Sequence, residues 1–300
     1  MRIGLTGAGS TVDRMVDTAV RAEADGFSSL WYASAIAGDP LVTIALAGRA
    51  TTSIELGTAV LQTYTCHPVL QAGRARSVVD GMGRPGFTLG IGPSHKPPIE
   101  DMLGIPYDHP GRHTEEYVSI LVRLLRGEAV RHDGIDFPRV RVPETGVVTP
   151  VPVLVSALAP RMLRIAAEQT DGTVLWMGNA RSIETHVAPL LAEAGGPGQR
   201  IVAGLPVAVH DDLDEARATA AQVFAGYGVL PNYRRILDIG GAPGPEDAAI
   251  LGSEEQVAAG ISALFDAGAT DVWAAVFPVG ADRRASRDRT MALLRDLVRR

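Results

Sequence analysis

The chain is poor in cysteine, lysine and long apolar runs, and each shortage excludes a class of protein. A single cysteine, Cys66, excludes an intrachain disulfide framework and a metal site built from several thiolates. Lys96 is the only lysine, and the net charge of −6 gives no electrostatic support for binding nucleic acid. No apolar run reaches the roughly 18 residues of a membrane-spanning helix, and the first residues lack the basic and then apolar order of a secretory signal. We therefore expect a cytoplasmic protein that binds neither nucleic acid nor membrane.

What the chain does contain indicates a globular α/β protein. Its 300 residues, 46% hydrophobic and 21% charged, can form a sizeable core. Apolar, β-branched runs alternate with helical periods, which favours a parallel sheet. The predicted strands are Arg2–Thr6, Ser28–Tyr32, Ile54–Val60, Gly86–Ile91, Val153–Ser156, Thr173–Trp176, Ile201–Val209 and Asp271–Phe277. Eight strands, each followed by a helix, are typical of a (β/α)8 TIM barrel. Because no linker interrupts the alternation, we expect a single domain over residues 1–300.

Three stretches depart from the strand and helix alternation. Residues 93–110 are polar and rich in proline, and residues 229–251 are irregular, with GGAPGP at 240–245. Residues 129–150 alternate apolar and polar side chains, which predicts a hairpin. Long excursions of this kind often form lids or substrate-binding loops. We therefore expect loop insertions at the C-terminal face of the barrel.

The ends of four predicted strands carry small, polar or aromatic residues, at 58–63, 92–95, 156–161 and 176–179. In parallel α/β proteins these ends share one face, and cofactors bind there. Small residues allow the backbone to approach a planar ring. Backbone N–H groups at the start of the helix after Pro160 can hold a phosphate, with Arg161 beside them. Trp176 fits either a ligand contact or the barrel core.

Other motifs are weaker. The first turn, Gly4 to Gly9, has the spacing GxxGxG and no acidic residue ends the second strand, which argues against a nicotinamide-binding fold. The patterns GxxxxGK and GxSxG are absent, which excludes a P-loop and disfavours a serine hydrolase. His109, His113 and Glu116 have the spacing of metal ligands, but Pro110 and Gly111 separate the histidines and indicate a helix start. We expect no metal site.

Five segments follow one another along the chain: LGTAVLQTYTCHP, GRPGFTLGIGPSHKP, GRHTEEYVSILVRLLRGEAV, PVPVLVSALAPRMLRIAAEQTDGTVLWM and ILGSEEQVAAGI. In this order they resemble the luciferase-like monooxygenase superfamily, and within it the branch that uses the deazaflavin coenzyme F420. The resemblance implies a barrel that transfers a hydride between F420 and a small, fairly apolar organic substrate. It leaves two alternatives open: an FMN-dependent monooxygenase, and a non-catalytic protein that binds F420 or flavin.

The resemblance also implies which residues hold the coenzyme. The ring would lie against a bulge of strand three containing a non-prolyl cis peptide, which corresponds here to the Ala59–Val60 bond. The strand-four end would line the ring, the strand-five end would hold the phosphodiester tail, and the strand-six end would close the other side. The implied coenzyme-binding residues are Ser34, Thr58, Ala59, Val60, Gly92, Ser94, Val155, Ala157, Leu158, Ala159, Arg161, Trp176, Met177 and Gly178.

One departure from the family pattern affects the proton-handling residues. Several F420-using relatives carry an acidic residue and a histidine after strand two, where this chain has Ser34 and Ala35. His95, His67 and Asp39 are the remaining catalytic candidates, although Asp39 also suits a helix N-cap and either histidine also suits a structural hydrogen bond. We expect the nearby Lys96 to keep His95 neutral. The resemblance does not identify the substrate. It implies a homodimer formed through helices near strands two and three.

Overall fold

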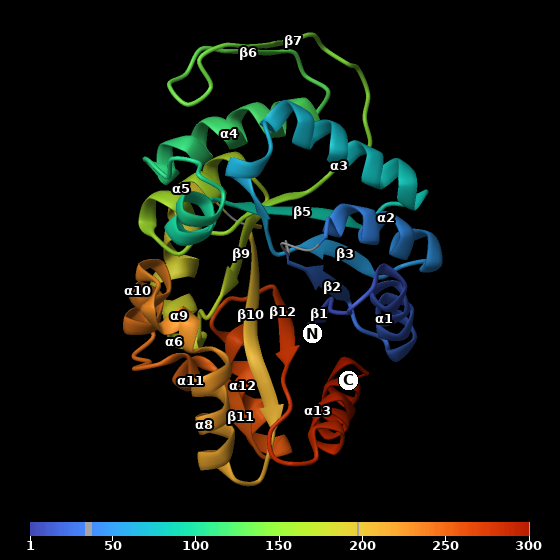
Figure 1. Ribbon diagram of the computed structural model, residues 1–300, viewed down its shortest axis with the longest axis vertical. Coiled ribbons are helices and arrows are strands. Elements are labelled where there is room, and N and C mark those ends of the chain that lie inside the picture. Colours follow the sequence, from blue (N-terminus) through green and yellow to red (C-terminus); the bar gives the residue numbers. More distant parts are fainter. Residues whose placement is uncertain (34–37, 197, 300) are drawn as a thin grey trace.

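The computed structural model, which describes residues 1–33, 38–196 and 198–299, contains a closed parallel barrel (Figure 1). Each strand pairs with the next, and β1 pairs with the last strand and closes the ring. The barrel strands are β1 (Ile3–Thr6), β2 (Ser29–Tyr32), β3 (Glu55–Thr58), β5 (Phe87–Gly92), β8 (Val153–Val155), β9 (Gly172–Trp176), β10 (Arg200–Val209) and β12 (Asp271–Val276). Two short strands extend the sheet: β4 (Leu61–Gln62) beside β5, and β11 (Ile250–Gly252) beside β10. The predicted (β/α)8 fold is confirmed.

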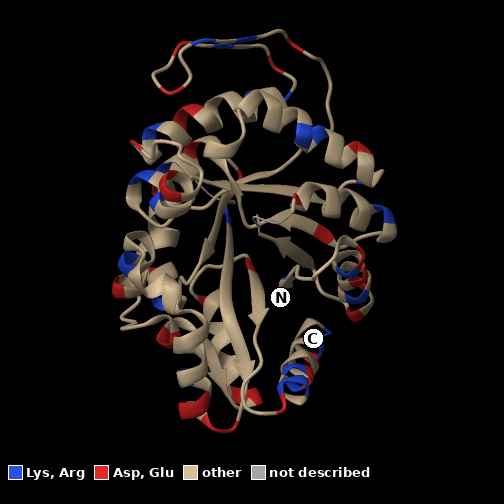
Figure 2. Cartoon of the chain, in the orientation of Figure 1, with Lys and Arg blue, Asp and Glu red and all other residues tan. Residues whose placement is uncertain are grey.

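Helices surround the strands, and their ends lie where the sequence places capping residues. The side chains of Thr11, Asp39 and Ser253 each accept a backbone N–H at a helix start, and Gly26 ends the first helix with φ +92°. The surrounding helices are α1 (Val12–Asp25), α2 (Pro40–Ala50), α3 (Pro68–Met82), α4 (Pro110–Leu125), α5 (Pro160–Gln169), α6 (Ala180–Ser182), α7 (Ala188–Gly195), α12 (Glu254–Asp266) and α13 (Arg283–Val298). Charged residues lie mainly on these helices and on the outer loops (Figure 2). No helix among the described residues is long and apolar enough to cross a membrane.

The inside of the barrel is filled by a small apolar cluster around two indole rings. Trp31, Leu154, Val174, Val202 and Trp273 form this cluster, and all five are buried. The glycines on neighbouring strands make room for the rings, because a Cβ at Gly57 would lie 2.4 Å from the Trp31 ring and one at Gly204 would lie 2.0 Å from the Trp273 ring. The close approach of backbone to indole therefore requires glycine at both positions.

An ion-pair network closes the N-terminal end of the barrel. Arg200 starts β10 and donates to Glu55, at the start of β3, and to Asp271, at the start of β12, over 2.8 Å to each. Arg2 pairs with the same two carboxylates. Burial alone would raise the pKa of Asp271, but hydrogen bonds from Arg200, Thr270 and Arg2, together with the charge of Arg200, outweigh it and lower the pKa.

The largest excursion lies at the C-terminal ends of the strands, as expected. Between β10 and β11 the chain forms α8 (Leu213–Val223), α9 (Ala225–Val229), α10 (Pro231–Ile239) and α11 (Pro245–Ala248). We call residues 213–248 the α8–α11 insertion. Its aromatic side chains reach the barrel mouth, where Phe224 and Tyr227 pack edge-on against Trp176 at the end of β9.

The predicted hairpin exists, but it does not belong to the C-terminal face. Strands β6 (Val130–His132) and β7 (Val140–Val142) pair antiparallel between the end of α4 and the start of β8, and so leave the opposite end of the barrel. The hairpin folds back along α4, at the top of Figure 1. Its tip is held there because Glu116 accepts the backbone N–H groups of residues 135, 136 and 137, each over 3.0 Å.

Candidate active site

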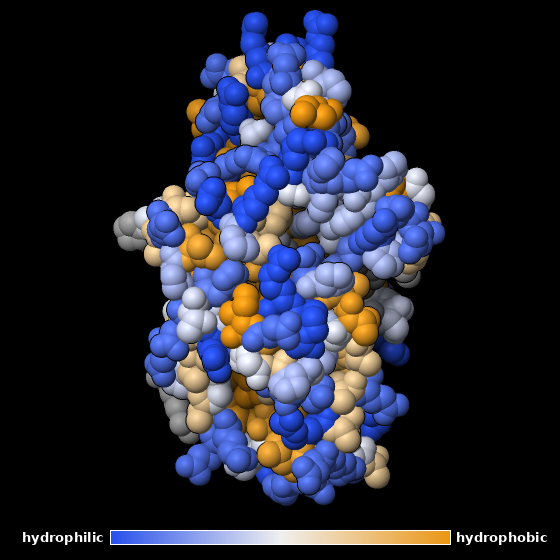
Figure 3. All heavy atoms as spheres, turned by 90° about the vertical axis from the view of Figure 1, so that its left-hand side faces the viewer, coloured by the Kyte–Doolittle hydropathy of each residue, from blue (hydrophilic) through white to orange (hydrophobic). Residues whose placement is uncertain are grey.

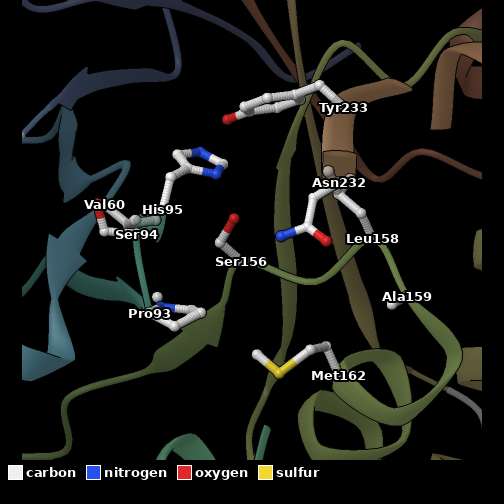
Figure 4. Close-up of a pocket in the computed structure, with 11 residues that line it drawn as sticks. Val60, Pro93, Ser94, His95, Ser156, Leu158, Ala159, Met162, Asn232 and Tyr233 are labelled. Carbon is white, nitrogen blue, oxygen red and sulfur yellow. The ribbon is translucent and has the colours of Figure 1, made fainter. Parts of the chain in front are cut away.

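A pocket opens at the barrel mouth between four parts of the chain. The turn between β3 and β4, the end of β5, the end of β8 with the start of α5, and the start of α10 all contribute to it (Figure 4). The lining residues are Val60, Gly92, Pro93, Ser94, His95, Ser156, Leu158, Ala159, Met162, Asn232 and Tyr233. Six of them, namely Val60, Gly92, Ser94, His95, Leu158 and Ala159, belong to the set named from the sequence. On the side of the molecule that carries α10, a largely hydrophilic surface is interrupted by hydrophobic residues (Figure 3).

The backbone on the β3 and β5 side of the pocket has an unusual shape. The Ala59–Val60 peptide bond is cis, as the resemblance implies, and Ser94 has φ +65°. Two side chains fix the Ser94 turn, because Gln62 donates to its hydroxyl over 3.3 Å and the Tyr107 hydroxyl donates to its carbonyl over 2.8 Å. The structure therefore holds one wall of the pocket through contacts from β4 and from the loop that follows β5.

His95 presents its imidazole to the pocket beside the Tyr233 ring, with 5.1 Å between the ring centroids. Burial lowers the pKa of His95, so the ring is neutral at physiological pH. The direction of this pKa shift agrees with the expected neutral ring, but its physical cause differs from the one that the sequence suggested. The Lys96 side chain is 66% exposed and pairs with Glu100, and burial of His95 is the cause of the shift.

Several residues that the resemblance assigns to the coenzyme are buried away from the pocket. Val155, the last residue of β8, and Ala157 are buried in the core between barrel and helices, whereas Ser156 and Leu158 line the pocket. Met177 is buried in the same core. Thr58 joins β3 to β5, since its hydroxyl donates to the Gly90 carbonyl over 2.7 Å and accepts the Gly90 N–H.

Two catalytic candidates and Arg161 have structural partners outside the pocket. Asp39 caps α2 by accepting the Leu41 N–H and pairs with Arg74. His67 caps α3 by accepting the Val69 N–H. Arg161 forms a 2.8 Å ion pair with Glu115. These contacts agree with the N-cap alternative for Asp39 and leave His95 as the candidate that faces the pocket.

Four further residues were assigned to the coenzyme: Ala59, Trp176, Gly178 and Ser34. Ala59 and the half-buried Trp176 pack against the cluster inside the barrel. Gly178 follows β9 and does not line the pocket. Ser34 lies outside the described residues.

Sequence reasoning missed Asn232 and Tyr233. Both come from the α8–α11 insertion, far along the chain from the strand ends whose residues they face. The signal that pointed to them was the irregular stretch 229–251, which indicated a lid or a binding loop without naming a side chain. Met162 was also missed, although it directly follows the predicted segment 156–161 at the end of β8.

Small residues and an uncapped helix start border the pocket. Gly92 has no side chain and those of Ser94 and Ser156 are small, which leaves the strand ends open to a flat group. At the start of α5, Ala159 provides no side-chain cap, so the first N–H groups of the helix remain available to a phosphate. Among the described residues, no three His, Cys, Asp or Glu side chains gather to hold a metal ion.

Comparison with known proteins finds a family model and a relative that each cover most of this chain. The model of the family "Luciferase-like monooxygenase" matches residues 2–271. A 5,10-methylenetetrahydromethanopterin reductase from Methanolobus tindarius is 27% identical over 87% of this chain and 89% of its own.

Solved structures share the fold. An F420-dependent secondary alcohol dehydrogenase in complex with an F420-acetone adduct has a TM-score of 0.78 and 16% identity, with 97% of each chain covered. The oxygenating constituent of 3,6-diketocamphane monooxygenase from Pseudomonas putida, in complex with FMN, has a TM-score of 0.68 and 19% identity, with 99% of this chain and 97% of that chain covered. With a family match over most of its length and the same barrel, this chain is an oxidoreductase of the luciferase-like monooxygenase family.

Proposed function

We propose that the protein uses coenzyme F420 to move a hydride to or from a small organic substrate held at the barrel mouth. The observation that carries this proposal is the pocket itself, in which small residues at the ends of β5 and β8 lie beside the cis Ala59–Val60 bond. The F420-dependent relatives support the choice of coenzyme. FMN is the alternative, since a neighbour of the same fold holds FMN.

The residues present divide into three groups by what they would do. Val60, Gly92 and Ser94 would hold the ring, and the start of α5 at Ala159 would hold the phosphodiester tail. When bound, F420 supplies a ring carbon that accepts or donates a hydride. His95 faces the pocket, and burial favours its neutral form. It would donate a hydrogen bond to a substrate oxygen or exchange a proton with it.

Coenzyme titrations test the proposal. We expect the purified protein to bind F420 with micromolar affinity, and more tightly than FMN, when free coenzyme is measured by equilibrium dialysis. Tight FMN binding without F420 binding would instead favour the flavin monooxygenase. Reduced F420 that binds but is not oxidised by any of a panel of enones, imines and ketones would favour a protein that carries the coenzyme without catalysis.

The start of α5 gives a sharper prediction about coenzyme placement. In Ala159→Asp, a carboxylate would stand beside the coenzyme phosphate, and we expect at least about tenfold weaker F420 binding from charge repulsion. Ala192→Asp adds the same charge at an exposed position of α7 and is the matched control. Unchanged affinity in a folded Ala159→Asp protein would show that the phosphate lies elsewhere.

A further inference from the structure

We propose that Tyr233, from the α8–α11 insertion, selects the substrate. Its hydroxyl donates a hydrogen bond to the oxygen of an uncharged carbonyl compound or alcohol, and the part of the pocket beside Tyr233 and His95 rejects ionised groups of the substrate. This inference rests on the proposed function, because it names the substrate class of the same pocket. Three observations support it: the lining side chains are uncharged, several of them have no hydrogen-bond partner among the described residues, and aromatic contacts hold Tyr233 in place.

The lining side chains carry no formal charge at neutral pH. The eleven described residues that surround the pocket include neither Asp, Glu, Lys nor Arg. Burial keeps His95 neutral and keeps Tyr233 protonated, since it lowers the pKa of the imidazole and raises that of the phenol. Beside His95 and Tyr233, a carboxylate or ammonium group of a substrate would therefore lose its water without gaining a counter-ion, which is costly. The start of α5, which the proposed function assigns to the coenzyme phosphate, borders a different part of the pocket. The part beside His95 and Tyr233 suits a neutral group.

The polar groups of the pocket are free to meet such a ligand. The side chains of His95, Ser156 and Tyr233 form no hydrogen bond to any other described residue, whereas the Ser94 hydroxyl already accepts from Gln62. A protonated phenol donates one hydrogen bond, and a carbonyl oxygen accepts one. The Tyr233 hydroxyl points over the pocket on the His95 side, so one ligand oxygen can approach both groups (Figure 4).

Aromatic contacts hold Tyr233 in this position. Its ring packs edge-on against Tyr227, with 5.0 Å between centroids and an interplanar angle of 87°. Tyr227 in turn packs against Trp176, and Trp176 stacks on Trp273 inside the barrel over 5.1 Å. This row connects α10 to the barrel core, so the hydroxyl is presented from a supported ring.

The test measures ligand binding directly and does not depend on turnover. Acetophenone and 4-acetylbenzoate share a ring and a ketone but differ by one carboxylate. The binding of each to the coenzyme-free protein is measured by ligand-observed NMR in phosphate buffer, so that inorganic phosphate competes for the start of α5. We expect acetophenone to bind at least about tenfold more tightly than 4-acetylbenzoate. In Tyr233→Phe we expect acetophenone to bind about fivefold to tenfold more weakly, from the loss of one hydrogen bond. Tyr227→Phe, which removes a neighbouring hydroxyl that does not line the pocket, should stay within about twofold.

The outcomes separate this inference from the proposed function. Equal affinity for the two ketones, unchanged acetophenone binding in Tyr233→Phe, or no acetophenone binding at all would overturn the inference. F420 affinity is measured on the same three proteins by dialysis. Failure of the wild-type protein to bind F420, alongside the expected pattern for the ketones, would overturn the coenzyme assignment and leave the role of Tyr233 supported.

Discussion

Replacing His95 by glutamine is expected to lower turnover by about 10²–10⁴-fold while F420 affinity stays within about threefold. The imidazole faces the pocket from the end of β5, and burial lowers its pKa, so it is the best placed of the titratable candidates to exchange a proton with a substrate oxygen. Glutamine retains much of the hydrogen-bonding capacity but cannot exchange a proton. Steady-state kinetics, combined with coenzyme dialysis, separate an effect on chemistry from an effect on binding.

His210→Gln is the matched control for this prediction. His210 pairs with Glu215 near the start of α8 and does not line the pocket, so the same substitution there should leave both turnover and coenzyme affinity at wild-type values. If turnover of His95→Gln remains within about threefold of wild type, His95 does not transfer the proton. If His95→Gln lowers F420 affinity but leaves turnover unchanged, His95 binds the coenzyme and does not transfer the proton.

Replacing Arg200 by methionine is expected to lower the free energy of unfolding by about 3–5 kcal/mol. Arg200 joins Glu55 and Asp271 at the base of the barrel, and the Asp271 side chain is only 2% exposed. Methionine fills similar space but leaves these carboxylates with Arg2, which is half exposed, as their remaining cation. Urea unfolding, followed by far-ultraviolet circular dichroism, measures the loss.

Two comparisons show whether burial of the network causes this effect. Arg289→Met breaks ion pairs with Asp211 and Glu254 on the surface and should cost less than about 1 kcal/mol. Because the folded-state pKa of Asp271 lies below its usual value, its contribution is present above about pH 4 and is lost as pH falls through the folded pKa. The gap between wild type and Arg200→Met should therefore narrow in acid. Equal losses in the two variants would contradict a special role for the buried network.

The barrel could be predicted because its signals are local. Each strand is an apolar run bounded by turn residues, and the count of eight with helices between them specifies closure. For the same reason the strand-end residues Val60, Gly92, Ser94 and His95 could be named, since the ends of parallel strands meet at one face. The hairpin was recognised from its alternation, but its place beside α4 depends on Glu116, whose contacts no pattern reveals.

The rest of the pocket could not be predicted because it depends on tertiary packing. A single residue of register decides which side chains at the end of β8 face the pocket. Val155 and Ala157 lie in the core, and Ser156 lines the pocket. Tyr233 reaches His95 only because the α8–α11 insertion folds back over the mouth through its aromatic contacts. Neither arrangement leaves a periodic signal in the chain.

The positions of the three tryptophans have a practical consequence for spectroscopy. Trp31 and Trp273 belong to the cluster inside the barrel, Trp176 packs against it, and Val60 of the pocket packs against the same cluster. Since the chain has no other tryptophan, all indole emission of the protein arises within this one region. Intrinsic fluorescence is therefore a label-free reporter placed beside the pocket, with no background from the outer helices. During unfolding, the same emission will follow the opening of the barrel interior, whereas circular dichroism will follow the loss of the helices around it.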